Sequence, residues 1–554
     1  MKRIAAVFFF VKENSELESL RHKMSEKENV GRAAGTVGFY TFLSRILGLV
    51  RDVVVARFFG AGMAADAFFV AFRIPNLLRR LFAEGALTIA FIPVFTEYLT
   101  RKSREEAFQM ARAALTLLSL ILVLVALSGV LLSPWIVRIQ AFGFGGSGAK
   151  YELTVLLTRI TFPYIFLVSL VAFFMGILNS LRHFAAPAAA PIFLNVGIIG
   201  ATLWISPRFE QPIIGVAIGV IIGGLLQVAL QIPWLLKKGV SLIPCWMPGH
   251  PAVKRIGLLM LPAVFGSAVY QLNQFIGTLL ASFLQEGSIS WLYYADRIVE
   301  FPLGVFAIAV STATLPSLAK QAAAGELGDF RDTLGHSLRL VLFITLPSMA
   351  GMILLREPIV QVFFQRGAFD ALSTHMTAVA LFYYSLGLWA FSANRVMVSA
   401  FYAFQDTKTP VKVAAVTMAV NVAFSLLLMG PFKHGGLALA LSLASTVQFF
   451  LLLFILRRRE NLFDLEPMVR TIVKSLAASL VMGFLVYYLN AHWFMKGEAA
   501  SSAIGAARLG AIVLIGGVVY FSAASLLRCS ELSFLGDLLR PVMGKLKTKQ
   551  DSEM

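Results

Sequence analysis

Long apolar segments recur along the whole chain, and they constrain its fold more than any other feature. Each is about 20 residues or longer, the length that an α-helix needs to cross a bilayer core of about 30 Å. The composition, with 58% hydrophobic and 14% charged residues, does not suit a soluble fold, because soluble cores stop growing at about 250–300 residues and keep a polar outer face. We therefore predict an all-α polytopic membrane protein with fourteen transmembrane spans, at residues 35–58, 63–95, 107–134, 154–180, 186–205, 212–236, 257–284, 290–318, 337–355, 372–403, 410–429, 435–456, 471–490 and 505–527.

The distribution of Lys and Arg predicts how these spans are oriented. About 29 of them fall on the side that carries both termini and about 7 on the opposite side, and basic residues favour the cytoplasm. Both termini are therefore predicted to be cytoplasmic, with tails at residues 1–33 and 531–554. The formal net charge of +18 then follows from topology and from attraction to anionic lipid headgroups, and it requires no nucleic-acid partner.

The chain also contains an internal repeat with an offset of roughly 220–226 residues. Six spans separate each matching pair, so the two copies have the same orientation. We predict two pseudo-symmetric six-helix lobes, residues 34–238 and 239–460, with the substrate path between them and two C-terminal helices in residues 461–530. The matching pairs are Gly62 with Gly287, Ile92-Pro93 with Leu315-Pro316, Phe162-Pro163-Tyr164 with Phe382-Tyr383-Tyr384, Gly215-Val216-Ala217 with Gly436-Leu437-Ala438, and Gln227 with Gln448.

Several charged residues lie within predicted spans, where the bilayer disfavours them. A charge at the centre of a span costs about 2.5–3.5 kcal/mol, so such residues are expected to pair or to face a hydrated cavity between the lobes. Arginines outnumber carboxylates among them, and the planar guanidinium binds phosphate with two hydrogen bonds, so the pattern predicts an anionic substrate. The residues are Arg45, Arg51, Asp52 and Arg57 in the first span, Asp66, Arg73, Arg79, Arg80 and Glu84 in the second, and Asp296, Arg297 and Glu300 in the eighth.

Helical spacing indicates which of these charges can pair. Arg297 and Glu300 are three residues apart and share a helix face. Arg45 and Asp52 are seven apart and also share a face, whereas the adjacent Arg51 and Asp52 point in different directions and are not expected to pair well. A structural alternative stays open for Arg57, Arg73 and Asp66, which can lie near span ends and extend to the lipid headgroups.

Other features argue against ATP hydrolysis and acyl transfer by this chain. The only Gly-Lys pair, Gly544-Lys545, is followed by leucine, so there is no Walker A motif, and no G-x-S-x-G nucleophile motif is present. The two cysteines, Cys245 and Cys529, are too few for a metal cluster or a disulfide framework. Asn195 and Asn421 are predicted to form hydrogen bonds between helices rather than to bind a ligand.

The charged spans and one connection carry distinctive strings of residues. These are Ser44-Arg45-Ile46-Leu47-Gly48-Leu49-Val50-Arg51-Asp52, Pro75-Asn76-Leu77-Leu78-Arg79-Arg80-Leu81-Phe82-Ala83-Glu84-Gly85-Ala86, Trp291-Leu292-Tyr293-Tyr294-Ala295-Asp296-Arg297 and Gln405-Asp406-Thr407-Lys408-Thr409-Pro410. They resemble the MurJ (MviN) family, and the resemblance runs from about residue 34 to about residue 528.

This resemblance implies the fold of the multidrug/oligosaccharidyl-lipid/polysaccharide exporters. It implies a flippase that moves lipid II, the undecaprenyl-pyrophosphate-linked disaccharide-pentapeptide, from the cytoplasmic to the periplasmic leaflet of the bacterial inner membrane by alternating access, for cell wall synthesis. Membrane lipids and the cell wall synthesis machinery are then the expected partners, and the two C-terminal helices form a groove for the lipid tail. The substrate-binding residues that it implies are Arg45, Arg51 and Arg297 for the pyrophosphate, Asp52 as their carboxylate partner, and Asp66, Arg79 and Glu84.

The sequence departs from the family in the seventh span. Some members have a sodium site with an acidic residue there, but residues 257–285 contain no Asp or Glu, and Gly277 stands where the acid is expected. This departure argues against a sodium site of that type. Because the sequence contains no nucleotide-binding motif, we predict no cofactor and transport driven by the membrane potential or an ion gradient. Two alternatives stay open: an exporter of the same fold for another lipid-linked oligosaccharide or amphiphile, and a membrane enzyme that acts on the same lipid.

Overall fold

The computed structural model describes residues 35–78, 88–460, 464–494 and 503–532. Within these ranges the chain forms helices and short connections without a β-strand, which confirms the all-α prediction. Contacts group the helices into two units. Of the described residues, the first unit contains those up to Val54, within Phe72–Ser133 and within Leu157–Phe265; the second contains those within Val55–Ala71, within Pro134–Leu156 and from Gly266 onward. The two predicted six-helix lobes stay a prediction.

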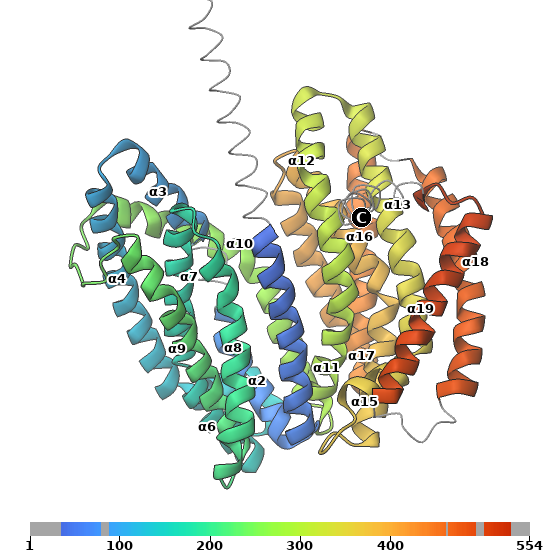
Figure 1. Cartoon of the computed structure of the whole chain (residues 1–554), viewed down its shortest axis with the longest axis horizontal. Coiled ribbons are helices and arrows are strands. Elements are labelled where there is room, and N and C mark those ends of the chain that lie inside the picture. Colours follow the sequence, from blue (N-terminus) through green and yellow to red (C-terminus); the bar gives the residue numbers. More distant parts are fainter. Residues whose placement is uncertain (1–34, 79–87, 461–463, 495–502, 533–554) are drawn as a thin grey trace, which may run out of the picture. The chain divides into compact units, whose positions relative to one another are not determined.

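Aromatic and small side chains form the core of the first unit. Phe91, Phe95, Met110 and Phe173 are almost completely buried there and belong to one cluster. These four side chains come from three helices, which pack together through their apolar faces. The helices of this unit are the first part of residues 35–59, the end of α2 (Met63–Leu78), α3 (Thr88–Arg101), α4 (Arg104–Leu131), the end of α6 (Ala149–Thr161), α7 (Tyr164–Ser180), α8 (Ala185–Trp204), α9 (Ile213–Lys237) and the start of α10 (Pro251–Ser282) (Figure 1).

Glycine allows α8 and α9 to pack at very short distance. A Cβ atom on Gly197 would lie 2.5 Å from the Cα atom of Gly223, and one on Gly219 would lie 2.7 Å from the Cβ atom of Ala201. Small residues at facing positions let two membrane helices approach until their backbones touch, which is how apolar helices associate without a hydrophobic driving force.

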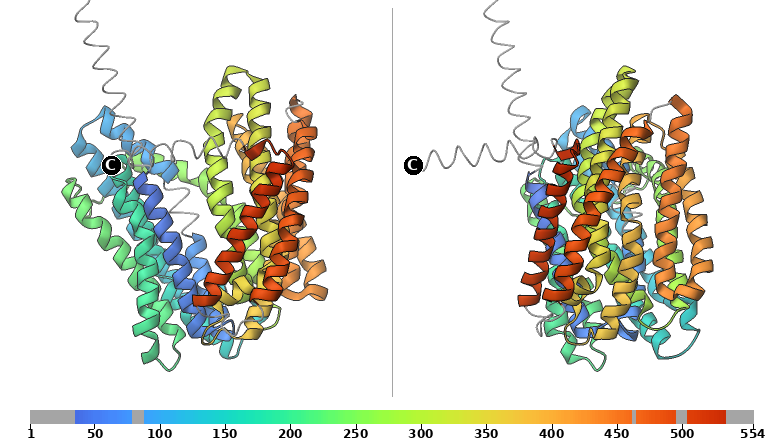
Figure 2. Two further views of the ribbon diagram at one scale, coloured as in Figure 1. Left: turned by 45° about the vertical axis from the view of Figure 1, so that its right-hand side comes forward. Right: turned by 90° about the vertical axis from the view of Figure 1, so that its right-hand side faces the viewer.

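The second unit contains most of the remaining helices. The pair α18 and α19 lies side by side in all views (Figures 1 and 2). A π-helical turn, Leu303–Ala307, follows Pro302 and joins α11 to α12. The helices are the start of α2 (Met63–Leu78), α5 (Ser133–Gln140) from Pro134 on, the start of α6 (Ala149–Thr161), the end of α10 (Pro251–Ser282), α11 (Ser288–Pro302), α12 (Ile308–Ala324), α13 (Leu327–Leu354), α14 (Arg356–Phe364), α15 (Ala371–Leu386), α16 (Leu388–Ala403), α17 (Lys408–Glu460), α18 (Leu465–Leu489) and α19 (Ala503–Leu526).

The long element α17 is a hairpin of two helices. Its backbone breaks at Lys433, where φ is 50° and ψ is −130°. A straight helix of 53 residues would be about 80 Å long. Instead Arg459, near its end, donates a hydrogen bond of 3.3 Å to the hydroxyl of Thr409, near its start. The chain therefore reverses in between, in agreement with the separate spans predicted at residues 410–429 and 435–456.

The number of spans is not confirmed as fourteen. Within the described ranges, nine helices are long and apolar enough to cross a membrane, or ten if the pair α15 and α16, bent by 43°, counts as one span. Two predicted spans fall within α17, which counts once among the nine. Part of the second predicted span, residues 79–87, lies outside the described residues.

Two helix ends share a left-handed backbone turn, and the internal repeat itself stays a prediction. Arg182 and Gln405 both have a φ of 58°, a left-handed conformation that usually requires glycine. At both ends the amide of this residue bonds the carbonyl three residues back, and the next amide bonds the carbonyl five residues back. Gln405 follows Arg182 by 223 residues, which lies within the offset of the matched sequence pairs.

Candidate functional site

Arg51 is held in a fixed orientation within the first unit. Its Nε and Nη2 atoms donate hydrogen bonds of 3.0 and 2.7 Å to Oδ1 of Asp52, and its Nη1 atom donates one of 3.2 Å to Oδ1 of Asn195 on α8. Asn195 in turn donates through Nδ2 to the carbonyl of Ser44, as expected for a hydrogen bond between helices. The guanidinium side chain is only 12% exposed. A carboxylate and an amide thus fix the plane of this guanidinium.

The pairing of Asp52 differs from the sequence prediction. We expected Arg45 to face Asp52 and the adjacent Arg51 to point elsewhere, but Arg51 is the residue that binds the carboxylate. The prediction was wrong because helix-face arguments place the Cβ atom, whereas an arginine side chain is long enough to fold back along its own helix. Arg45 is exposed.

Asp66 lies in the second unit as a nearly completely buried carboxylate, 1% exposed. Its oxygens accept hydrogen bonds of 2.8 Å from the Gly287 amide, 2.9 Å from the Ser290 amide and 2.7 Å from the Ser290 hydroxyl. The Lys150 ammonium donates a fourth, of 2.8 Å. The first turn of α11 offers unpaired amides and a positive dipole end, so this carboxylate caps the helix. These contacts give Asp66 a structural role, and its binding of substrate stays a prediction.

A second carboxylate, that of Glu286 just before α11, caps the start of α2. Oε1 of Glu286 accepts a hydrogen bond of 2.8 Å from the amide of Met63, the first residue of α2. The backbones meet so closely that a Cβ atom on Gly287, whose φ is +90°, would lie 2.5 Å from the carbonyl oxygen of Ala61. Gly62 and Gly287 are a matched pair of the repeat, so equivalent helices cap each other's first turns. Sequence analysis missed Glu286, although an acidic residue directly before a helix-starting glycine was a usable signal.

Arg297 forms the ion pair that its spacing predicts. Its Nη1 atom donates a hydrogen bond of 2.7 Å to Oε2 of Glu300, and Nη2 donates one of 3.2 Å to the hydroxyl of Tyr293. The guanidinium also lies 5.0 Å from the centre of the Tyr293 ring, which stacks on Phe69 at 3.9 Å. With its side chain 33% exposed, Arg297 is oriented but accessible.

The remaining charged residues of the predicted site either lie outside the described residues or are exposed. Arg79 and Glu84 lie outside the described residues. Arg57 is exposed, and its carbonyl accepts a hydrogen bond of 2.8 Å from the Ala368 amide. The convergence of Arg45, Arg51 and Arg297 on one anion stays a prediction.

A hydrogen bond between two asparagines joins α17 to α10 in the second unit. Nδ2 of Asn421 on α17 donates a hydrogen bond of 2.9 Å to Oδ1 of Asn273 on α10. This confirms the prediction for Asn421.

Among the described residues, no three His, Cys, Asp or Glu side chains gather into a group that could hold a metal ion.

Residues of the string Gln405-Asp406-Thr407-Lys408-Thr409-Pro410, at the start of α17, close the hairpin. Asp406 accepts hydrogen bonds from the Thr409 amide at 2.9 Å and the Thr409 hydroxyl at 2.7 Å, and it forms a salt bridge with Arg459. Burial raises the pKa of Asp406, but the Thr409 hydrogen bonds and the Arg459 charge outweigh it and hold the pKa at about 2. This carboxylate therefore stays ionised at neutral pH and ties the two ends of α17 together.

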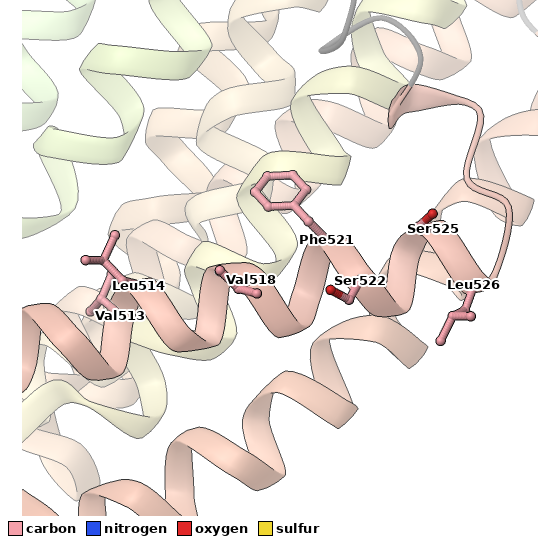
Figure 3. A pocket seen from close by; sticks show the side chains of 8 residues that line it. Val513, Leu514, Val518, Phe521, Ser522, Ser525 and Leu526 are labelled. Carbon is pink, nitrogen blue, oxygen red and sulfur yellow. The ribbon is translucent and has the colours of Figure 1, made fainter.

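An open apolar groove of about 800 Å³ runs along α19 (Figure 3). The exposed fractions of Leu514, Val518 and Leu526 are 73%, 67% and 86%. Such a face suits an apolar chain that lies along the helix axis. The lining residues are Val513, Leu514, Gly517, Val518, Phe521, Ser522, Ser525 and Leu526.

Comparison with known proteins identifies the family. Residues 55–506 match the family model described as "Lipid II flippase MurJ". The chain belongs to the MurJ family. A "Probable lipid II flippase MurJ" of Vibrio cholerae is 40% identical over 475 residues, which are 83% of this chain and 90% of that protein. A "Lipid II flippase MurJ" of Burkholderia cenocepacia is 35% identical over 498 residues, which are 89% of this chain and 96% of that protein.

Solved structures agree with membership of the MurJ family. A "Lipid II flippase MurJ" in an "inward closed conformation" superposes with a TM-score of 0.75 at 30% identity, covering 91% of this chain and 99% of that one. An inward-facing multidrug resistance transporter of the MATE family has a TM-score of 0.66 at 14% identity, covering 76% of this chain and 95% of that one. The second likeness shows a shared fold, as the sequence analysis expected.

Proposed function

We propose that this MurJ-family protein flips lipid II across the bacterial inner membrane for cell wall synthesis. Family membership and the partly buried, oriented Arg51 support this proposal. The transport cycle is alternating access, in which the headgroup enters from the cytoplasmic leaflet and leaves toward the periplasmic leaflet. Both termini are cytoplasmic in this proposal, because basic residues dominate that side.

The pyrophosphate is the part of lipid II that the arginines recognise. The Arg51 guanidinium, with its plane fixed by Asp52 and Asn195, offers hydrogen bonds in a preset geometry and so loses little entropy on binding. Arg45 and Arg297 complete the anion site in this proposal. Glu300 balances the charge of Arg297 until a phosphate replaces it.

The remaining predicted residues support this anion site. Arg79 and Glu84 contribute to the headgroup cavity, and Asp66 contributes by holding the first turn of α11, the helix that carries Arg297. An error of about 1 Å in the position of a binding group is enough to impair transport or catalysis severely. The cap on α11 therefore serves the site even though its carboxylate is buried.

The lipid tail lies along the α19 groove in this proposal. A polyprenyl chain is apolar and long, so it remains in the bilayer while the headgroup crosses between the leaflets. Because the sequence contains no nucleotide-binding motif, the membrane potential or an ion gradient supplies the energy, at about 2.3 kcal/mol per charge per 100 mV. Membrane lipids and enzymes of cell wall synthesis are the proposed partners.

Complementation tests the choice of cargo. The gene is expressed in bacteria whose own lipid II flippase is depleted, beside Arg51→Gln and, as a control, Arg101→Gln at an exposed position. We expect the wild-type chain and Arg101→Gln to restore growth and Arg51→Gln to fail at equal membrane abundance. Failure of the well-expressed wild-type chain would favour an exporter of another lipid-linked oligosaccharide.

A further inference from the structure

Three carboxylates are buried in the described residues, and one of them has no part in the headgroup site. Asp52 and Asp66 belong to the contacts described above, whereas Glu531, 2% exposed, follows the end of α19. Burying a carboxylate is expensive unless hydrogen bonds and an opposite charge compensate it. Glu531 has both: the Thr471 hydroxyl donates a hydrogen bond of 2.7 Å, and the Arg339 Nε atom lies 3.4 Å away.

A left-handed turn brings Glu531 to these partners. Arg528 has a φ of 50°, its amide bonds the carbonyl of Ser525, and the amide of Cys529 bonds that of Ala524. This helix end reverses the chain. Lys474 on α18 fixes the turn by donating a hydrogen bond of 3.0 Å to the carbonyl of Arg528. The turn therefore directs the carboxylate back toward α13 and α18.

A second contact holds α19 on the same face of α13. The Tyr520 hydroxyl donates a hydrogen bond of 2.6 Å to the carbonyl of Phe343, and the two rings lie 5.2 Å apart. Arg339 and Phe343 are four residues apart on α13, so they lie one above the other on one helix face. Two polar contacts on this face thus tie α19 and the turn that follows it to α13.

The opposite face of α19 is the open apolar groove. Val513, Leu514 and Val518 project from the helix into this groove and are more than half exposed (Figure 3). A helix held at one face and open at the other presents a fixed surface to a long apolar chain. The contacts of Glu531 therefore hold the end of that surface against α13 and α18.

We propose that Glu531, through Thr471 and Arg339, is a positioning residue for the polyprenyl tail of the substrate. This inference rests on the proposed lipid II flippase function. Glu531 touches no substrate itself. It fixes α19, and through α19 it determines how well a tail long enough to occupy the groove is transported.

Substrates with different tails test this role. Purified wild-type protein and Glu531→Gln are reconstituted, and flipping is measured for lipid II with its natural tail and for the same headgroup on a short prenyl tail. We expect Glu531→Gln to reduce the ratio of the long-tail to the short-tail rate about tenfold, as loss of a hydrogen bond to a charged group would. The control is Glu466→Gln on α18, an exposed carboxylate paired with Arg470, which should leave the ratio unchanged.

The ratio of the two rates distinguishes a positioning role of Glu531 from a purely structural role. An equal loss on both tails, or an unchanged ratio, would overturn the positioning role, because a purely structural residue affects both substrates alike. If Glu531→Gln does not fold, Thr471→Val, which removes one of the two partners, is measured in the same way. A wild-type protein that flips neither substrate would refute the proposed function instead, and binding of a labelled polyprenol to wild type and Glu531→Gln then tests the groove alone.

Discussion

Replacement of Asp66 by alanine tests whether this carboxylate is a helix cap or a substrate ligand. The substitution removes three hydrogen bonds to the start of α11 and the salt bridge to Lys150. Loss of an Asp cap costs about 1 kcal/mol, and breaking a buried ion pair costs about 3–5 kcal/mol. The Lys150 side chain keeps 19% exposure, so water compensates part of its loss. We expect the free energy of unfolding to fall by roughly 3 kcal/mol.

The assay is unfolding of the purified protein in detergent, combined with lipid II transport in vesicles. Asp66→Asn, which keeps one acceptor oxygen, should lose about half as much stability. Asp329→Ala, at an exposed position in the first turn of α13, is the control and should stay within about 0.5 kcal/mol of wild type. An Asp66→Ala protein that is as stable as wild type but cannot transport would refute the cap and support direct contact with substrate.

Three further predictions concern other contacts. Asn195→Leu should reduce the lipid II flipping rate about tenfold without unfolding the protein, because the Arg51 guanidinium loses one hydrogen bond that orients it; an unchanged rate would show that this bond is not needed. Gly436→Ala should destabilise the hairpin of α17, because its Cβ atom would overlap the backbone carbonyl oxygen of Leu428, whereas Gly430→Ala has open space and should not; equal unfolding free energies would contradict the hairpin geometry. The Asp406 carboxylate has a pKa of about 2 in the folded protein, below the ordinary value of about 3.9, so its contribution to stability is present above about pH 4 and is lost as the pH falls toward 2. The difference in unfolding midpoint between wild type and Asp406→Asn should therefore disappear at low pH, and a difference that persists there would refute the assignment.

Contacts within one helix were largely predictable from the sequence. The Arg297–Glu300 pair follows from its spacing, and the two helices within α17 follow from their separate apolar runs. The exception is Arg51 with Asp52, where periodicity placed the Cβ atoms correctly but did not describe the reach of a long side chain.

Contacts between distant parts of the chain were less predictable. Glu286 and Lys150 carried no periodic signal, and their roles arise only when the starts of α2 and α11 come together. Glu531 lies in what the sequence analysis assigned to a cytoplasmic tail, because a single acidic residue after an apolar run resembles a solvated end. Its burial depends on a turn at Arg528 with a backbone conformation that hydropathy does not report.

The central claim is that arginines in this MurJ-family protein carry the lipid II headgroup across the membrane. The most direct test is a leaflet assay in vesicles that contain only purified protein and labelled lipid II, measured with and without an imposed membrane potential. The account predicts that wild-type protein moves lipid II between leaflets, that the potential changes the rate, and that folded Arg51→Gln protein is inactive. Full activity of Arg51→Gln, or no lipid II movement by folded wild-type protein under either condition, would contradict it.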